Sequence, residues 1–135
     1  MEKDYCYLAK VVAVYDGDTI TVDVDLGFEI AMLKQKLRLY RINAPEVRGS
    51  ERREGLVSRD VLIALLLERN VLLVTYKDKK GKFGRWLADI YIEKEWAEDM
   101  AATISLSAPA AEDRPGMYMV NRLLVEWGLA EWKEY

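Results

Sequence analysis

Apolar and polar residues alternate with a period of two in the first part of the chain, which is typical of half-buried β-strands. The segment "YLAKVVAV", 7–14, is rich in β-branched and aromatic residues, and "DTITVDVDL", 18–26, alternates strictly. Asp16-Gly17 between them predicts a hairpin, because a tight turn joining twisted strands needs positive φ, which glycine adopts at little cost.

A third strand is predicted over 36–43, where Leu37 and Leu39 alternate with Arg38. Its end and the following turn are unusually polar for a strand that needs an apolar face. Three residues make them so: Arg41, Asn43 and Glu46.

The period changes to that of an amphipathic helix after residue 50, and we expect Ser50 to cap this helix and Asn70 to lie near its end. Two more strands are predicted over 71–77 and 85–93. A C-terminal amphipathic helix follows, with Gly128 as its C-terminal cap.

This order of elements predicts a mainly β protein with helices (α+β), a five-stranded oligonucleotide-binding (OB) type β-barrel with about three helices. With 135 residues, 51% of them hydrophobic, we expect one domain over 1–135. Residues 94–118 lose the strand period and form an atypical acidic insert, of which 96–104 is expected to be helical.

The longest purely apolar run, 61–67, is far shorter than a membrane span, so no membrane partner is expected. The chain starts with charged residues where a secretory signal would be apolar. Cys6 is the only cysteine, so no internal disulfide can form. We therefore expect a cytoplasmic monomer, with secretion open if the chain is a trimmed form of a longer one.

The chain has no histidine, which excludes imidazole-based catalytic triads and histidine metal sites. With one cysteine, structural zinc is excluded as well. Catalysis by this chain must use carboxylates, Arg, Lys, Tyr, hydroxyl groups or a metal ion bound by oxygen.

Charge is divided along the chain, although the net charge is only −3. Residues 34–85 hold 14 Lys and Arg against 6 Asp and Glu, a local +8, and the rest carries −11. A basic middle between acidic ends suits a phosphate-binding patch. An ordinary solvated surface explains the same division equally well.

Asp18 is the first residue that can carry chemistry, although Asp-Gly turns are common without any function. An EF-hand starting at Asp18 is excluded, because its sixth position is Asp23 where glycine is required. Arg38, Glu46 and Arg85 each have an ordinary surface or turn interpretation. Together these residues offer carboxylates and two guanidinium forks, which suit bidentate binding of a phosphodiester.

Four segments in order resemble the staphylococcal nuclease (thermonuclease-like) family: "VVAVYDGDTITV", "LRLYRINAPE", "GKFGRWLADIYI" and "MVNRLLVEWGLAEW". They cover most of the chain except the stretch after Ile92. The resemblance implies a five-stranded OB-type barrel and a calcium-dependent nuclease. Such an enzyme cleaves DNA and RNA with little sequence specificity and leaves 3′-phosphate ends.

Matching positions carry the family's roles onto this sequence. Asp18 corresponds to a carboxylate ligand of Ca²⁺, and Ala44 to a residue whose backbone carbonyl contributes to the metal. Arg38 and Arg85 correspond to the two phosphate-binding arginines. Glu46 corresponds to the glutamate proposed to activate the attacking water.

Two positions depart from the pattern. Asn43 stands where the family has a second aspartate ligand, so we expect weaker calcium binding or a shifted metal preference. Phe83 stands where Tyr is frequent; it keeps a ring for stacking on a base but has no hydroxyl for a phosphate. Salt-sensitive binding of the nucleic-acid backbone is expected from four lysines: Lys77, Lys79, Lys80 and Lys82.

Two other classes of function remain open. One is a non-catalytic OB-fold module that binds nucleic acid or protein through a degenerate metal site, which Asn43 favours. The retained Asp18, Arg38, Glu46 and Arg85 favour the enzyme. The other is an interaction protein that works through the Trp-containing acidic insert.

Overall fold

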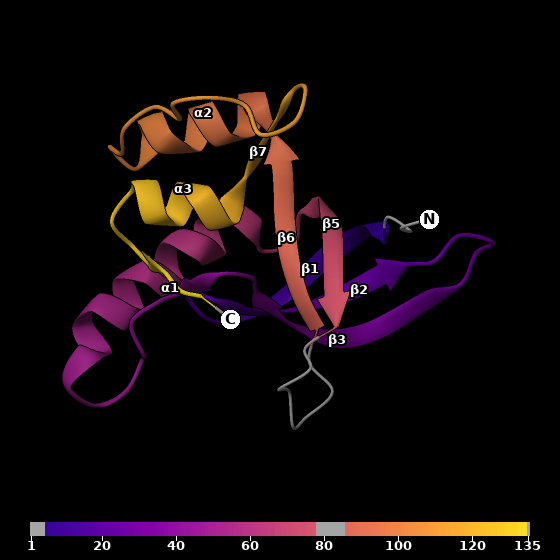
Figure 1. Ribbon diagram of the computed structural model, residues 1–135, viewed down its shortest axis with the longest axis horizontal. Coiled ribbons are helices and arrows are strands. Elements are labelled where there is room, and N and C mark those ends of the chain that lie inside the picture. Colours follow the sequence, from indigo (N-terminus) through magenta and orange to yellow (C-terminus); the bar gives the residue numbers. More distant parts are fainter. Residues whose placement is uncertain (1–4, 78–85, 135) are drawn as a thin grey trace.

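The structure is a computed structural model that describes residues 5–77 and 86–134 (Figure 1). Its strands are β1 (Cys6–Asp16), β2 (Thr19–Asp25), β3 (Ala31–Leu39), β4 (Ile42–Asn43), β5 (Asn70–Lys77), β6 (Trp86–Glu93), β7 (Met117–Met119) and β8 (Glu131–Trp132). Its helices are α1 (Arg52–Leu66), α2 (Lys94–Thr103) and α3 (Val120–Glu126), and a 3₁₀ turn at Gly49–Glu51 precedes α1.

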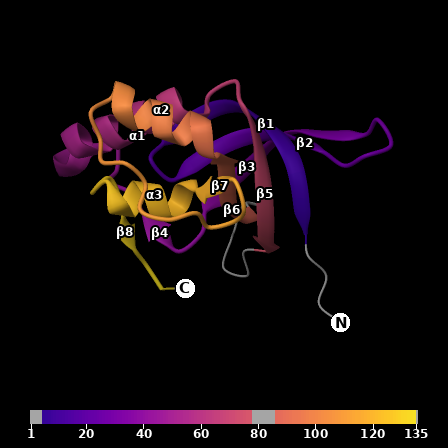
Figure 2. The same ribbon diagram turned by 90° about the horizontal axis from the view of Figure 1, so that it is seen from above.

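Five strands close into the expected OB-type barrel. The sheet order is β3-β2-β1-β5-β6-β7, and β3 also pairs with β6 in parallel, from Leu37↔Trp86 to Leu39↔Ala88. This pairing closes the barrel and leaves β7 as an extra strand. All three helices gather at one end of the barrel, and the β2–β3 hairpin extends away at the other (Figures 1 and 2).

Alternation along the strands produces the core, because successive side chains point to opposite faces. Ile20, Val22, Leu37 and Leu39 are buried in the barrel. The helices close its end with fully buried leucines, among them Leu62, Leu65, Leu66, Leu123 and Leu124. Each contributes roughly 1.5–3 kcal/mol by leaving water, so the predicted amphipathic patterns are the main source of stability.

Local expectations about the ends of α1 are wrong in detail. Ser50 does not cap the helix, because α1 begins at Arg52 after the 3₁₀ turn and its N-terminus has no side-chain cap. The helix ends at Leu66 instead of Asn70, and Glu68 adopts a left-handed φ of 64°. The expectation for Gly128 is confirmed, since it has a φ of 74° directly after α3.

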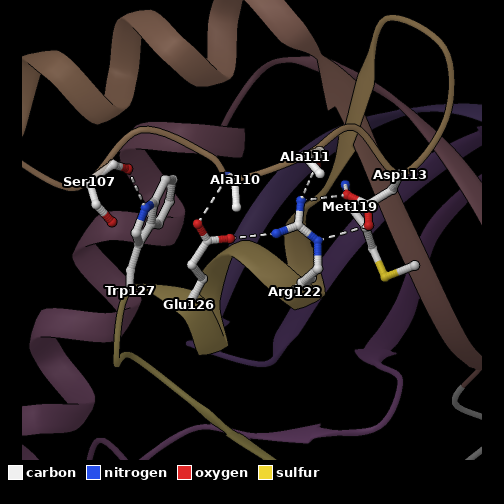
Figure 3. A network of polar contacts seen from close by, with 8 residues as sticks. All are labelled: Ser107, Ala110, Ala111, Asp113, Met119, Arg122, Glu126 and Trp127. Atoms are coloured by element: carbon white, nitrogen blue, oxygen red, sulfur yellow. Dashed lines mark hydrogen bonds and ion pairs between the residues drawn. The ribbon is translucent and has the colours of Figure 1, made fainter.

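The predicted acidic insert, 94–118, contains α2, and its following loop is tied to α3 by the network in Figure 3. The Arg122 guanidinium donates to Asp113 at 2.8 and 2.9 Å and to the Ala111 carbonyl at 2.6 Å, and it also pairs with Glu126. Hydrogen bonds to Asp113 raise the pKa of Arg122. Trp127 adds a bond from Nε1 to the Ser107 carbonyl at 2.9 Å.

Within the described residues, the model contains no helix with the length and apolar character needed to cross a membrane.

Candidate functional site

Three segments that are distant in sequence meet at one edge of the barrel: the β1–β2 turn, the end of β3 and the turn after β4. Gly17 allows this meeting, because a Cβ there would lie only 2.8 Å from the Cβ atoms of both Ala44 and Ser58. Gly17 does not have positive φ. The sequence-based reason for this glycine is therefore wrong: close approach of the backbone requires it.

Asp18 is the central carboxylate of this site and is only 3% exposed. Its Oδ2 accepts a hydrogen bond from the Ala44 N–H at 2.9 Å, and its Oδ1 accepts from the Thr19 hydroxyl at 3.1 Å. The Asp18 carbonyl accepts from the Leu39 N–H at 2.8 Å. These bonds fix the carboxylate relative to both the barrel wall and the turn after β4.

Arg38 lies between two of the predicted metal ligands. Its Nη2 is 3.5 Å from Asp18 Oδ2 and donates to Asn43 Oδ1 at 3.0 Å. The side chain of Arg38 is 17% exposed. The structure thus brings Asp18, Arg38 and Asn43 together, with the guanidinium bridging the carboxylate and the amide.

Asp16 belongs to the same group and was interpreted from sequence only as a turn residue. Its Oδ1 accepts a hydrogen bond from the Asp18 N–H at 3.0 Å. Burial, together with the hydrogen bond and the charge of the neighbouring Asp18, raises the pKa of Asp16 to about 6. The spacing Asp-Gly-Asp was the available signal, because a tight turn places its two flanking carboxylates side by side.

The donor types at this edge are those that a hard divalent cation prefers, and the Arg38 guanidinium already contacts two of the three groups, Asp18 and Asn43. Asp16 and Asp18 supply neighbouring carboxylates, and Asn43 supplies an amide oxygen, all of which are ligand types that Ca²⁺ prefers. Ala44 presents its N–H to Asp18, so its carbonyl is the remaining predicted ligand. Within the described residues, no group of three or more His, Cys, Asp or Glu suits a metal, so any such site must use the amide and backbone oxygens.

Glu46 lies on the exposed turn after β4. In the described part of the chain, its carboxylate forms no hydrogen bond or ion pair with Asp18 or Arg38. Its N–H donates to Glu51 Oε2 at 3.0 Å. A Cβ on Gly55 would overlap the backbone carbonyl of Glu46. Helix α1 therefore packs directly against the backbone of this turn.

Of the predicted nucleic-acid-binding residues, Lys77 lies exposed at the end of β5. Five predicted residues lie outside the described residues: Lys79, Lys80, Lys82, Phe83 and Arg85.

A second polar cluster follows Arg38 along the chain and was not predicted. Arg41, left unassigned from sequence, has a φ of 65° and its guanidinium lies 4.6 Å from the centre of the Tyr40 ring. Tyr40 in turn stacks against Tyr76, whose hydroxyl donates to the buried Asp89 at 3.0 Å. Burial raises the pKa of Asp89, and burial together with the Asp89 charge raises that of Tyr76 to about 12.

Buried Asn121 connects this second cluster to the barrel closure. Its Nδ2 donates to the carbonyls of Tyr40 and Ala88, each at 3.0 Å, and its Oδ1 accepts from the Ile90 N–H at 3.1 Å. Because α3 carries Asn121, the helix fixes the strand end that positions Arg41 and Asn43.

No protein-family model matches the chain, and no curated protein matches it.

Proposed function

We propose that this protein is a metal-dependent nuclease of the staphylococcal nuclease family, which hydrolyses phosphodiester bonds of DNA and RNA with little sequence specificity and leaves 3′-phosphate ends. One observation carries the proposal: the carboxylate of Asp18, whose backbone N–H donates to Asp16 Oδ1, pairs with the Arg38 guanidinium at a barrel edge. The four ordered sequence blocks that resemble the family support it independently.

The chemistry follows from the charges of a phosphodiester. An anionic diester repels a nucleophile, so hydrolysis needs its charge neutralised and its attacking water oriented. Asp16, Asp18 and the Asn43 amide would hold Ca²⁺, which supplies charge neutralisation and polarises a phosphoryl oxygen when bound. The Arg38 guanidinium already lies beside the oxygens of Asp18 and Asn43, and its fork would bind the equatorial phosphate oxygens, an arrangement that Lys reproduces poorly.

Glu46 is the general base in this proposal, because its exposed carboxylate stands on the turn that directly follows Asn43 at the end of β4. Arg85 is the second phosphate-binding arginine of the proposal. Lys77 attracts the nucleic-acid backbone without reading its sequence.

A second candidate function is a module that binds nucleic acid or protein without cleaving it. The hydrogen bond from Arg38 to Asn43 favours it, since an arginine that bridges an amide and a carboxylate occupies the place of a shared cation. An amide at position 43 also removes one negative charge from the metal ligands.

Cleavage of a labelled single-stranded oligonucleotide and of plasmid DNA, in Ca²⁺, Mg²⁺ or chelator, tests the two functions. Four proteins are compared: wild type, Glu46→Gln, Asn43→Asp and Glu54→Gln. Glu54 is an exposed glutamate on α1, so Glu54→Gln is the matched control. Mass spectrometry of the products identifies the phosphate-bearing end.

The nuclease predicts cleavage that depends on a divalent cation, that Glu46→Gln reduces by about 100-fold or more, and that Glu54→Gln leaves unchanged. We expect Asn43→Asp to bind Ca²⁺ more tightly than wild type. If wild type binds DNA without cutting it and Asn43→Asp cuts, the binding module is correct. Neither binding nor cleavage by any of the four proteins would exclude both.

A further inference from the structure

The β2–β3 hairpin exposes a strand edge outside the barrel. β3 pairs with β2 along its length, but its pairing with β6 covers only Leu37 to Leu39. Its outer edge from 31 to 36 has no strand partner among the described residues. Two backbone groups of this stretch are already engaged by side chains, the Lys34 N–H by Asp23 Oδ1 and the Leu33 carbonyl by the Gln35 amide. The outward N–H and C=O groups that remain form a template for another strand.

The same hairpin is unusually apolar for an exposed segment. Phe28 at its tip is 98% exposed, Leu33 is 63% exposed, and Met32 is 46% exposed. Figures 1 and 2 both show the hairpin projecting away from the barrel and the helices. Lys34 and Lys36 are charges of the kind that protect an exposed strand edge, but an exposed apolar patch such as this one marks an interaction site.

A groove lies beside this edge, where β3 diverges from β5 and β6. It has a volume of about 850 Å³ and is lined by Met32 and Leu37 of β3, by Tyr7 of β1, and by Tyr76 and Trp86 of β5 and β6. It is therefore a mostly apolar cleft with five aromatic rings in its lining, beside a strand edge that has no strand partner among the described residues. This combination is the one used in strand addition, in which the backbone of a peptide gives affinity and pockets accept its alternate side chains.

Charge indicates the kind of strand that fits. Lys77 lines the groove and Lys36 is exposed on β3, while no Asp or Glu is among the described lining residues. We propose that this edge and groove bind an extended segment of a partner protein in which apolar residues alternate with acidic ones, and that the segment adds to β3 as a further strand. This interaction does not rest on the nuclease proposed above, although Lys77 belongs to both surfaces.

Two other occupants fit less well. A second copy paired edge to edge through β3 would bring Lys34 and Lys36 of both copies close together, and like charges across a strand pair are destabilising. Single-stranded nucleic acid would use the aromatic rings and the lysines. It would leave the backbone row of β3 unpaired, whereas a peptide strand satisfies it.

Synthetic octapeptides that alternate Glu with Leu, Val or Phe test the proposal. Binding is measured by fluorescence anisotropy, and the site by ¹H–¹⁵N NMR, with the whole chain in chelator so that nuclease activity plays no part. Two further forms of the best peptide carry N-methyl groups, one form on every Glu and the other on every apolar residue. Met32→Glu is compared with Val57→Glu, because Val57 is similarly exposed (51%) but lies on α1.

Strand addition predicts micromolar binding and changes in the NMR chemical shifts of residues 31–36. Only one of the two N-methylated forms should lose affinity, by about tenfold or more, because alternate N–H groups of the peptide face β3. Met32→Glu weakens binding by a similar factor and Val57→Glu does not. Equal binding of both N-methylated forms, or no binding of any peptide at millimolar concentration, overturns the proposal. It is equally overturned if oligothymidine displaces the peptide from 31–36, or if sedimentation shows a dimer that covers this edge.

Discussion

The ion pair between Arg38 and Asp18 is the contact on which the candidate site depends, and replacing Arg38 by Met tests it. The substitution keeps an apolar stem of similar length and removes the guanidinium. It leaves the Asp18 carboxylate, which is 3% exposed, with the hydrogen bonds from Ala44 and Thr19 as its remaining side-chain partners among the described residues.

The size of the effect follows from the distance and the burial. At 3.5 Å between Arg38 Nη2 and Asp18 Oδ2, the attraction is about 5 kcal/mol at an effective dielectric constant of about 20. Desolvation of the two charges offsets part of it. Removing one partner of a buried pair typically costs about 3–5 kcal/mol, and the partial exposure of Arg38 lowers our expectation to about 2–4 kcal/mol of the free energy of unfolding.

A double-mutant cycle separates the pair from the other contacts of Arg38. Asp18→Asn keeps an oxygen for the Ala44 N–H but removes the charge. The free energy of unfolding is measured in denaturant at pH 7 without divalent cations for wild type, both single variants and the double variant. The Arg38–Asn43 bond is lost on both sides of the cycle and cancels.

We expect a coupling energy of about 1–3 kcal/mol between the two positions. A coupling below about 0.5 kcal/mol would refute the reasoning, because it would mean that the guanidinium and the carboxylate do not interact in solution. Arg38 would then be a surface residue, and the site would lose its only described arginine.

Three further outcomes are expected. Gly55→Ala lowers the free energy of unfolding by about 1–3 kcal/mol through overlap with Glu46, and an unchanged midpoint in urea contradicts this. Arg122→Ala costs about 1–3 kcal/mol and increases amide exchange in the loop before β7, because the bonds to Asp113 are lost; unchanged exchange contradicts it. Burial raises the pKa of Asp89 above 3.8, so the folded state holds the carboxyl proton more tightly than the unfolded state does. The free energy of unfolding therefore falls as pH rises from about 4 through the raised pKa. Asp89→Asn flattens this decline in denaturant titrations, whereas parallel curves for the two proteins contradict the assignment.

Most of the fold is predictable from the sequence because its signals are local. Alternation along 7–14 and 18–26 identifies β1 and β2, and the basic, alternating 36–43 identifies the inner half of β3. Element ends are less predictable: Ser50 resembles a helix cap, yet the intervening 3₁₀ turn moves the helix start to Arg52. The outer half of β3 and the short β7 were missed, because pairing with β2 and β6 forms them and local alternation does not mark them.

The candidate site divides in the same way. Asp18, Arg38 and Asn43 were identified from residue type and resemblance, and the structure places them within hydrogen-bonding or ion-pair distance. Asp16 was missed although the Asp16-Gly17-Asp18 spacing was a local signal for it. The cluster around Arg41 was missed because Tyr76 and Asp89 come from strands that are distant in sequence.

By itself, the sequence determined which residue types are available for chemistry and which segments can form strands and helices, because composition and periodicity are properties of neighbouring residues. The tertiary structure alone decided that Gly17 serves close approach to Ala44 and Ser58, that Arg38 bridges Asp18 and Asn43, and that the outer edge of β3 is exposed. Each of these depends on where the barrel closes, which is set by the parallel pairing of β3 with β6, segments nearly fifty residues apart in the chain.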